Sequence, residues 1–286
     1  MLRAYLLGAA AATRRWPLIV ILWFIAAAFG VGFALASGAW LSEAFDGSLA
    51  ARTLARVIDA NVLVDLWYHH REGLHMLLVL AIVLAVVHSV LWWWLHGVVI
   101  VSLQRHPPER GGGSGESGGV WTGGLSLAPV MAQLFAIALI VLSLFSAAVG
   151  GPAYLLIRWT RSQPAAYIWY EIGGAALALW LLGWVFLVAV HDHARLRAGR
   201  TGESAFAVYR WAFGFVLHGG ERAFLLACAL QLTGLSLWLA YQVVAVSLPM
   251  TAILGLTGSL LWGEAFLLLR VWVRVWFFAA QNELQS

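Results

Sequence analysis

Residues 223–263 read AFLLACALQLTGLSLWLAYQVVAVSLPMTAILGLTGSLLWG and contain no Asp, Glu, Lys or Arg. A helix needs only about 20 apolar residues to cross the hydrocarbon core of a bilayer, so this run is too long for one crossing. Ser247-Leu248-Pro249 lies past its middle, and proline cannot continue a helix but fits the first turn of the next one. The run therefore predicts two membrane-spanning helices joined by a reversal.

The composition of the whole chain agrees with this interpretation. Of its 286 residues, 62% are hydrophobic and 10% are charged. A soluble domain carries about 45–50% apolar and about 25% charged residues. The composition argues strongly against a soluble globular enzyme and against a disordered chain, and it predicts an integral membrane protein.

Four further apolar runs precede residue 223, so we expect an all-α, polytopic membrane helix bundle with six transmembrane helices in a single domain, residues 1–286. The expected spans are about 16–41, 74–103, 125–149, 166–190, 223–246 and 250–278. Ala34-Leu35-Ala36 is similar to a signal-peptide cleavage site. We nevertheless retain the first helix, because the apolar stretch before that site is longer than a signal core and continues past it.

The basic residues predict the orientation. All 17 are arginines, which favours a GC-rich bacterial genome. Twelve lie at the N-terminus, in the second and fourth loops and at the end of the sixth span, and five lie on the other side. Cytoplasmic loops carry the excess of basic residues, so we expect a bacterial inner (plasma) membrane protein with both termini cytoplasmic. No basic stripe indicates nucleic-acid binding, and the lone Cys228 excludes an intrachain disulfide and a cysteine-rich metal site.

The segments between the spans have three different patterns. Residues 48–62 carry apolar residues at helical spacing and predict an amphipathic helix on the outer surface. The second loop, residues 105–124, is a Gly-rich sequence without the lysine of a phosphate-binding loop, and it predicts a flexible cytoplasmic linker. Residues 204–216 and 2–12 each lead into a span beside arginines and predict amphipathic interfacial helices. The bilayer is therefore the expected partner, with other membrane subunits or a second copy as further candidates.

The fourth loop and the hairpin that follows it carry a family resemblance. The segment contains Asp192-His193-Ala194-Arg195, an aromatic stretch over residues 205–215, and then His218 and Arg222 before the long apolar run. In this layout, and in Ser48-Leu49-Ala50-Ala51, the chain resembles uncharacterised six-helix bacterial membrane proteins related to the membrane domain fused to some glycerophosphodiester phosphodiesterases. The resemblance implies a six-helix inner-membrane protein with Asp192, His193 and Arg195 in a cytoplasmic motif. The catalytic domain of those phosphodiesterases has no counterpart in this chain.

Histidines are the strongest candidates for metal ligands. His69, His70 and His75 cluster at the outer end of the second span, where imidazoles could hold zinc or copper. Residues five apart, such as His70 and His75, diverge on a helix, so we favour solvated interfacial histidines and expect no cofactor. His75 and His88 have a spacing found in haem-binding helices, but no second helix carries a matching pair of ligands.

A second candidate site lies at the membrane midplane. An ionisable residue deep in a span is costly and is a functional candidate by default. Glu264 and His88 each lie 14 residues past the outer end of a span, and Gln231 reaches a similar depth from the inside. We therefore predict a cluster of His88, Gln231 and Glu264. A structural hydrogen-bond cluster is the favoured role, and a proton or substrate pathway is the alternative.

The first span carries small residues at a spacing of four: Ala26, Gly30, Ala34 and Gly38. Such a seam lets a second helix approach closely. It predicts helix packing within the chain or, as the alternative, a dimer contact.

No nucleophile–base pair, nucleotide motif or zinc-protease motif is present, so we do not expect an enzyme. The favoured function is a non-catalytic structural or accessory component of the inner membrane. The alternatives are a small-molecule, ion or lipid transporter that uses the midplane cluster and, third, a haem-bearing redox subunit.

The arginine asymmetry makes the topology testable. Reporter domains fused after Ser286 and inserted within residues 111–119 should both report a cytoplasmic location, because the arginine-rich segments stay inside. Activity of a reporter that folds only outside the cytoplasm, at either position, would contradict the orientation or the six-span count.

Overall fold

The computed structural model describes residues 1–45, 67–68, 70–104, 116–160, 167–218, 221–247 and 253–285. Apart from short turns between helices, these residues are helical, which confirms the predicted all-α class. The helices are α1 (Leu2–Thr13), α2 (Trp16–Phe45), α5 (Arg71–Gln104), α6 (Glu116–Thr160), α7 (Tyr167–Thr201), α8 (Ala205–His218), α9 (Glu221–Ser247) and α10 (Ile253–Gln285). The predicted outer helix at 48–62, His69 and the reversal at 248–250 lie outside the described residues.

Five helices in the described part of the chain are long and apolar enough to cross a membrane. They contain the segments Trp16–Trp40, Arg71–Gln104, Gly119–Thr160, Tyr167–Thr201 and Arg222–Ser247. Most of the side chains in these segments are not covered by other parts of the protein, as expected where lipid covers them. These properties indicate a membrane protein.

The helices differ from the predicted spans at their ends. The predicted linker extended to residue 124, but α6 begins at Glu116, so residues 116–124 are helical and that part of the prediction was wrong. Likewise, α7 continues to Thr201, beyond the predicted end at residue 190. Apolarity sets the length of a span, whereas a helix continues for as long as its backbone is hydrogen-bonded and its side chains pack.

The contacts divide the chain, for which we expected one domain, into two compact units. Unit 1 consists of residues 1–14, 93–235 and 275–286, and unit 2 consists of residues 15–92 and 236–274. The two units are described separately below.

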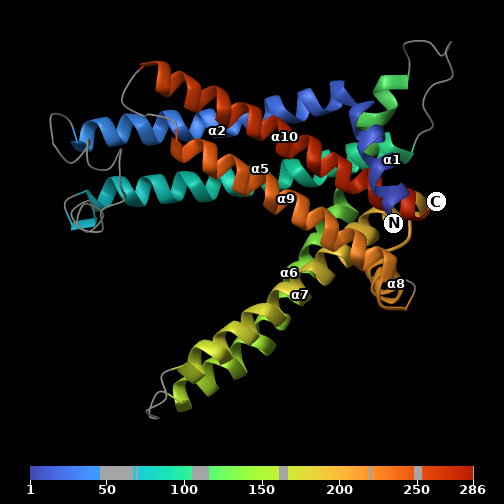
Figure 1. Ribbon diagram of the computed structural model, residues 1–286. Coiled ribbons are helices and arrows are strands. Elements are labelled where there is room, and N and C mark those ends of the chain that lie inside the picture. Colours follow the sequence, from blue (N-terminus) through green and yellow to red (C-terminus); the bar gives the residue numbers. More distant parts are fainter. Residues whose placement is uncertain are drawn as a thin grey trace. The chain divides into compact units, whose positions relative to one another are not determined.

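Unit 1 contains α1, α6, α7 and α8 together with the adjoining ends of α5, α9 and α10. Helices α6 and α7 form a long antiparallel pair (Figure 1). The core gathers aliphatic and aromatic side chains from these helices, among them Leu95, Leu134, Leu196, Leu226 and Phe278. At the N-terminus, the indole of Trp276 donates a hydrogen bond of 2.8 Å to the backbone carbonyl of Tyr5 and so ties α1 to α10.

Unit 2 contains α2 and the remaining parts of α5, α9 and α10. Aromatic contacts link α9 to α10: the ring centroids of Tyr241 and Phe266 are 4.2 Å apart. The Trp262 indole also donates a hydrogen bond of 3.3 Å to the carbonyl of Tyr241. Indole and phenol groups suit such contacts because they combine a large apolar area with one polar atom.

Close helix crossings in unit 1 depend on glycine. A Cβ atom at Gly97 in α5 would lie 2.7 Å from the carbonyl oxygen of Gly124 in α6. A Cβ atom at Gly8 in α1 would lie 2.5 Å from the backbone nitrogen of Ala280 in α10. Small residues are what allow two membrane helices to approach this closely.

These crossings predict opposite effects for two alanine substitutions. Gly97→Ala should destabilise the protein by about 1–3 kcal/mol, because α5 and α6 must separate to admit the methyl group. Gly214→Ala in α8 should be neutral or stabilising, because nothing lies within 4 Å of the added atom and alanine has the higher helix propensity. Thermal unfolding of the two purified variants in detergent compares them. Equal stability would contradict the close crossing.

Candidate functional site

The last turns of α7 contain buried polar side chains that the sequence analysis placed in a cytoplasmic motif. Asp192, His193 and Arg195 are 1%, 0% and 5% exposed. Charged groups are almost never this buried unless they are paired, since burial removes their hydration. Their partners therefore explain how this end of unit 1 holds together.

Asp192 is paired along its own helix and across to α10. The carboxylate lies 3.6 Å from the guanidinium of Arg195, which is one turn further along the same face. It also accepts a hydrogen bond of 3.4 Å from the side-chain amide of Gln281, which is itself buried. The acid thus joins α7 to α10.

His193 makes a second connection to α10. The Gln285 amide nitrogen lies 2.7 Å from Nδ1 of His193 and donates a hydrogen bond of 3.3 Å to the backbone carbonyl of the same residue. With the amide in this orientation, Nδ1 accepts, so the neutral imidazole carries its proton on Nε2. The ring edge packs on Phe215 of α8, with the centroids 5.0 Å apart.

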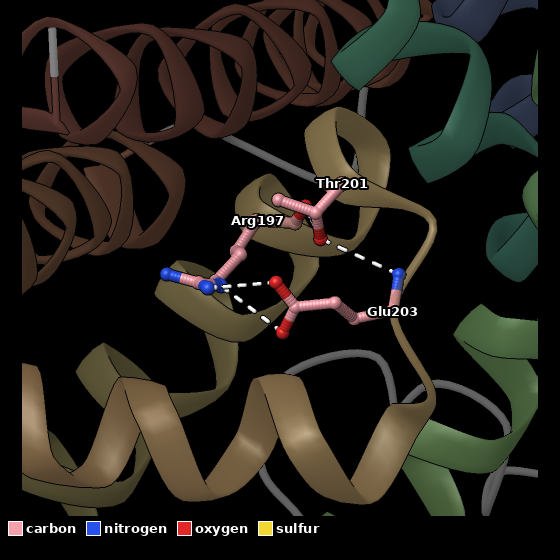
Figure 2. Close-up of polar contacts among 3 residues, drawn as sticks. All are labelled: Arg197, Thr201 and Glu203. Carbon is pink, nitrogen blue, oxygen red and sulfur yellow. Dashed lines mark hydrogen bonds and ion pairs between the residues drawn. The ribbon is translucent and has the colours of Figure 1, made fainter.

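The turn between α7 and α8 is held by a contact network at Arg197 (Figure 2). The guanidinium donates two hydrogen bonds to the Glu203 carboxylate, at 2.7 and 3.4 Å, and the Glu203 backbone N–H donates to the Thr201 hydroxyl at 3.4 Å. The hydrogen bond from Arg197 holds the pKa of Glu203 below its usual value. Arg197 also lies over the ring of Trp211 in α8, 4.3 Å from its centroid.

Two nearby helix ends are stabilised by Gly202, which ends α7, and by Arg200, which binds the end of α10. Gly202 has a φ of +66°, a left-handed conformation that glycine adopts without strain and that ends α7. Arg200 donates hydrogen bonds to the Asn282 side chain at 2.7 Å and to the carbonyls of Asn282 and Gln285 at 3.3 and 3.4 Å. A cation at the C-terminal carbonyls of α10 also complements the helix dipole.

One further aromatic group belongs to this cluster. Tyr209 on α8 is buried, and its ring centroid lies 6.4 Å from that of His191. Burial raises the pKa of the Tyr209 phenol to about 12. The phenol therefore stays protonated at any physiological pH.

The predicted midplane cluster is distributed over both units. Glu264 accepts a hydrogen bond of 3.1 Å from the indole of Trp23 in α2, within unit 2. His88, also in unit 2, packs edge-on against Phe29 and Trp92, at centroid distances of 5.1 and 5.5 Å. Gln231 belongs to unit 1. The partner of Glu264 that the sequence interpretation missed is therefore the indole of Trp23 in α2.

The other predicted groups lie on exposed surfaces. His75 is exposed beside Trp67, and His70 is half-buried. Among the described residues, no group of three His, Cys, Asp or Glu side chains could hold a metal ion. In the α2 seam, Ala26 is half-buried, whereas Gly30, Ala34 and Gly38 are exposed, and added Cβ atoms at the two glycines would meet nothing within 4 Å. No described segment packs closely on those two glycines.

The sequence interpretation also missed the glutamines of α10. Gln281 and Gln285 directly follow an apolar run and are four residues apart, so they share one helix face. That spacing was the available signal. It did not reveal the partners, because these come from α7, about 90 positions earlier in the chain.

The contacts in this cluster predict that substitutions of its residues will lower the free energy of unfolding by different amounts. Asp192→Ala should destabilise the protein by about 3–5 kcal/mol, because it leaves Arg195 buried without that carboxylate. Glu203→Gln should change stability far less, because the pair of Glu203 with Arg197 is partly exposed and screened by water. Thermal unfolding in one detergent measures both. If the two variants unfold at the same temperature, the buried pair does not stabilise the fold.

Comparisons with protein-family models, curated proteins and solved structures return no match for this chain. The resemblance to phosphodiesterase-linked membrane domains therefore stays a prediction from short motifs. The function has to be argued from the contacts described above.

Proposed function

We propose that this protein is a non-catalytic structural or accessory component of a bacterial inner membrane, with six transmembrane helices and both termini in the cytoplasm. Helix α10 is the sixth span, in addition to the five membrane-length helices. Helices α1 and α8 are interfacial. The resemblance to the membrane domains of glycerophosphodiester phosphodiesterases is part of this proposal and concerns only the membrane architecture.

The chain segments that make up unit 1 support an even number of transmembrane spans. The segments predicted to be cytoplasmic, namely the N-terminus, the end of α5, the α7–α8 turn and the end of α10, all belong to this unit. Helices α1 and α10 pack together there at Gly8 and Ala280, so the two chain ends are close (Figure 1). Termini on the same side of a membrane require an even number of crossings.

The structural role is supported by the buried polar groups, which form contacts between helices. Asp192 and His193 on α7 bind the side chains of Gln281 and Gln285 on α10, and Tyr5 on α1 lies within hydrogen-bond distance, 2.7 Å, of Thr233 on α9. Each contact joins two helices. Hydrogen bonds between helices of this kind favour one arrangement of the bundle.

A small transporter is the second candidate, and Glu264 is the observation that favours it. An acid in the middle of a membrane span marks ion or substrate pathways in many membrane proteins. Its carboxylate is half-buried and bound to Trp23. A single indole donor leaves the carboxylate with further acceptor positions.

Flux measurements distinguish the two candidates. Purified full-length protein in liposomes with a trapped pH indicator should show no proton flux above that of empty liposomes, and Glu264→Gln should give the same result. A flux that is present with the unmodified protein and absent in Glu264→Gln would overturn the structural proposal in favour of transport.

The role of Glu264 in stability is a separate prediction. Glu264→Leu should cost about 1–3 kcal/mol, because it leaves the part-buried N–H of Trp23 without its acceptor, whereas Glu264→Gln should be mild because the amide oxygen still accepts. A double-mutant cycle with Trp23→Phe measures the coupling through thermal unfolding. His88→Leu is the matched control and should combine additively with Glu264→Leu. Additive effects for the Trp23 pair would contradict the role of this hydrogen bond.

A further inference from the structure

Helix α8 has an exposed stripe of large apolar side chains around one arginine. Phe206, Phe213 and Leu217 are 72%, 42% and 57% exposed, and Arg210 is exposed between them. A helix turns by about 100° per residue, so these four residues lie within roughly 60° of one another. We refer to Phe206, Arg210, Phe213 and Leu217 as the α8 stripe.

A different face of the same helix is already used for packing. Ala205, Val208, Tyr209, Ala212 and Val216 are buried, and α8 contacts α7 and α6. The orientation of α8 on unit 1 is therefore fixed by alanine and valine side chains together with Tyr209. Phe206 and Leu217 lie away from that packed face, whereas Phe213 is partly exposed and its ring also contacts Phe186 of α7, with the centroids 5.4 Å apart.

The connections of α8 keep it close to a membrane boundary. Three residues separate it from the end of α7, and two separate it from the start of α9. Both neighbours are among the membrane-length helices. A helix held at the ends of two spans lies where the headgroups of the bilayer begin, and side chains with an apolar body suit that depth.

The charge within the stripe has no side-chain partner among the described residues. Arg195 and Arg197 are paired with Asp192 and Glu203, and Arg200 binds the carbonyls at the end of α10. In the described part of the chain, by contrast, no side chain pairs with Arg210. An unpaired guanidinium between exposed phenyl rings is complementary to an anionic headgroup above acyl chains.

Helix α1 has the same arrangement independently. Its buried residues are Ala4, Gly8 and Ala12, one helical turn apart, whereas Leu2, Leu6 and Leu7 are exposed together with Arg3. This helix leads directly into the membrane-length helix α2. Two helices of unit 1 thus combine a packed face of mainly small residues with an exposed apolar face that carries an arginine.

We propose that the α8 stripe is a binding surface for anionic phospholipid, with the phosphate of a lipid such as phosphatidylglycerol on Arg210 and its acyl chains against Phe206, Phe213 and Leu217. This inference rests on the membrane location proposed above and adds a preference for one class of lipid. Helix α1 contributes a second site of the same kind through Arg3.

A fluorophore next to the stripe tests the proposal in the full-length protein. In a Cys228→Ala background, Phe213→Cys carries the fluorophore, and Leu182→Cys, at an exposed apolar position of α7, carries it as a reference. The protein is reconstituted into bilayers of phosphatidylcholine and phosphatidylglycerol. Either lipid is then replaced by its brominated form, which quenches only nearby fluorophores.

The expected result is stronger quenching at position 213 by brominated phosphatidylglycerol than by brominated phosphatidylcholine at equal mole fraction. Arg210→Gln should reduce this preference by up to about fivefold, the factor for roughly 1 kcal/mol per basic residue at an anionic surface. Arg210→Lys should retain most of it. The matched control Arg158→Gln removes another exposed arginine and should leave the preference unchanged.

Three results would overturn the inference. The first is equal quenching by the two lipids at position 213, and the second is a preference that Arg210→Gln does not alter. The third is protection of position 213 from aqueous iodide that is lost when the protein is diluted to one copy per vesicle. Such a loss would mean that a second copy of the protein, and not lipid, covers the stripe. If lipid still quenches the fluorophore at position 182 in any of these cases, the proposed membrane location stands and only the lipid-binding inference fails. If lipid does not quench at position 182, the proposed function itself is wrong.

Discussion

The pairing of polar side chains between the end of α7 and the end of α10 is the contact on which the rest of unit 1 depends. Buried polar groups that lose their partners cost more free energy than most apolar contacts contribute. Asp192 binds Gln281, His193 binds Gln285, and Arg200 binds the last carbonyls of α10. A shift of α10 by one residue would break all three contacts. The network therefore fixes the register of the two helices, which nonspecific apolar packing would not do as strictly.

This network also explains why α7 continues as far as Thr201. Its last turns are rich in charged residues, and on composition alone they belong in a loop. They remain helical because α8 and α10 cover them and supply partners for their polar groups. Once α7 ends at Gly202, the pair of Arg197 with Glu203 and the stacking of Arg197 on Trp211 direct the chain into α8. The exposed stripe of α8 follows from that orientation.

Unit 2 satisfies its polar groups through isolated contacts. The carboxylate of Glu264 accepts from one indole, and the imidazole of His88 packs between aromatic rings. Such hydrogen bonds and ring contacts of aromatic side chains are few but directional. They suit helices whose remaining surface faces lipid. The two units thus use different chemistry, a dense hydrogen-bonded cluster in one and isolated aromatic contacts in the other.

The sequence by itself determined the helical class and the long apolar helices, because a bilayer permits few other spanning structures and composition reveals them directly. It also singled out Asp192, His193 and Arg195. Only the tertiary structure decided that these residues are buried, that Gln281 and Gln285 are their partners, and that Trp23 binds Glu264. The physical reason is sequence separation: these contacts join residues some 90 to 240 positions apart, and periodicity reports only neighbours on the same helix face. The structure likewise decided which face of α8 is packed and which face is exposed.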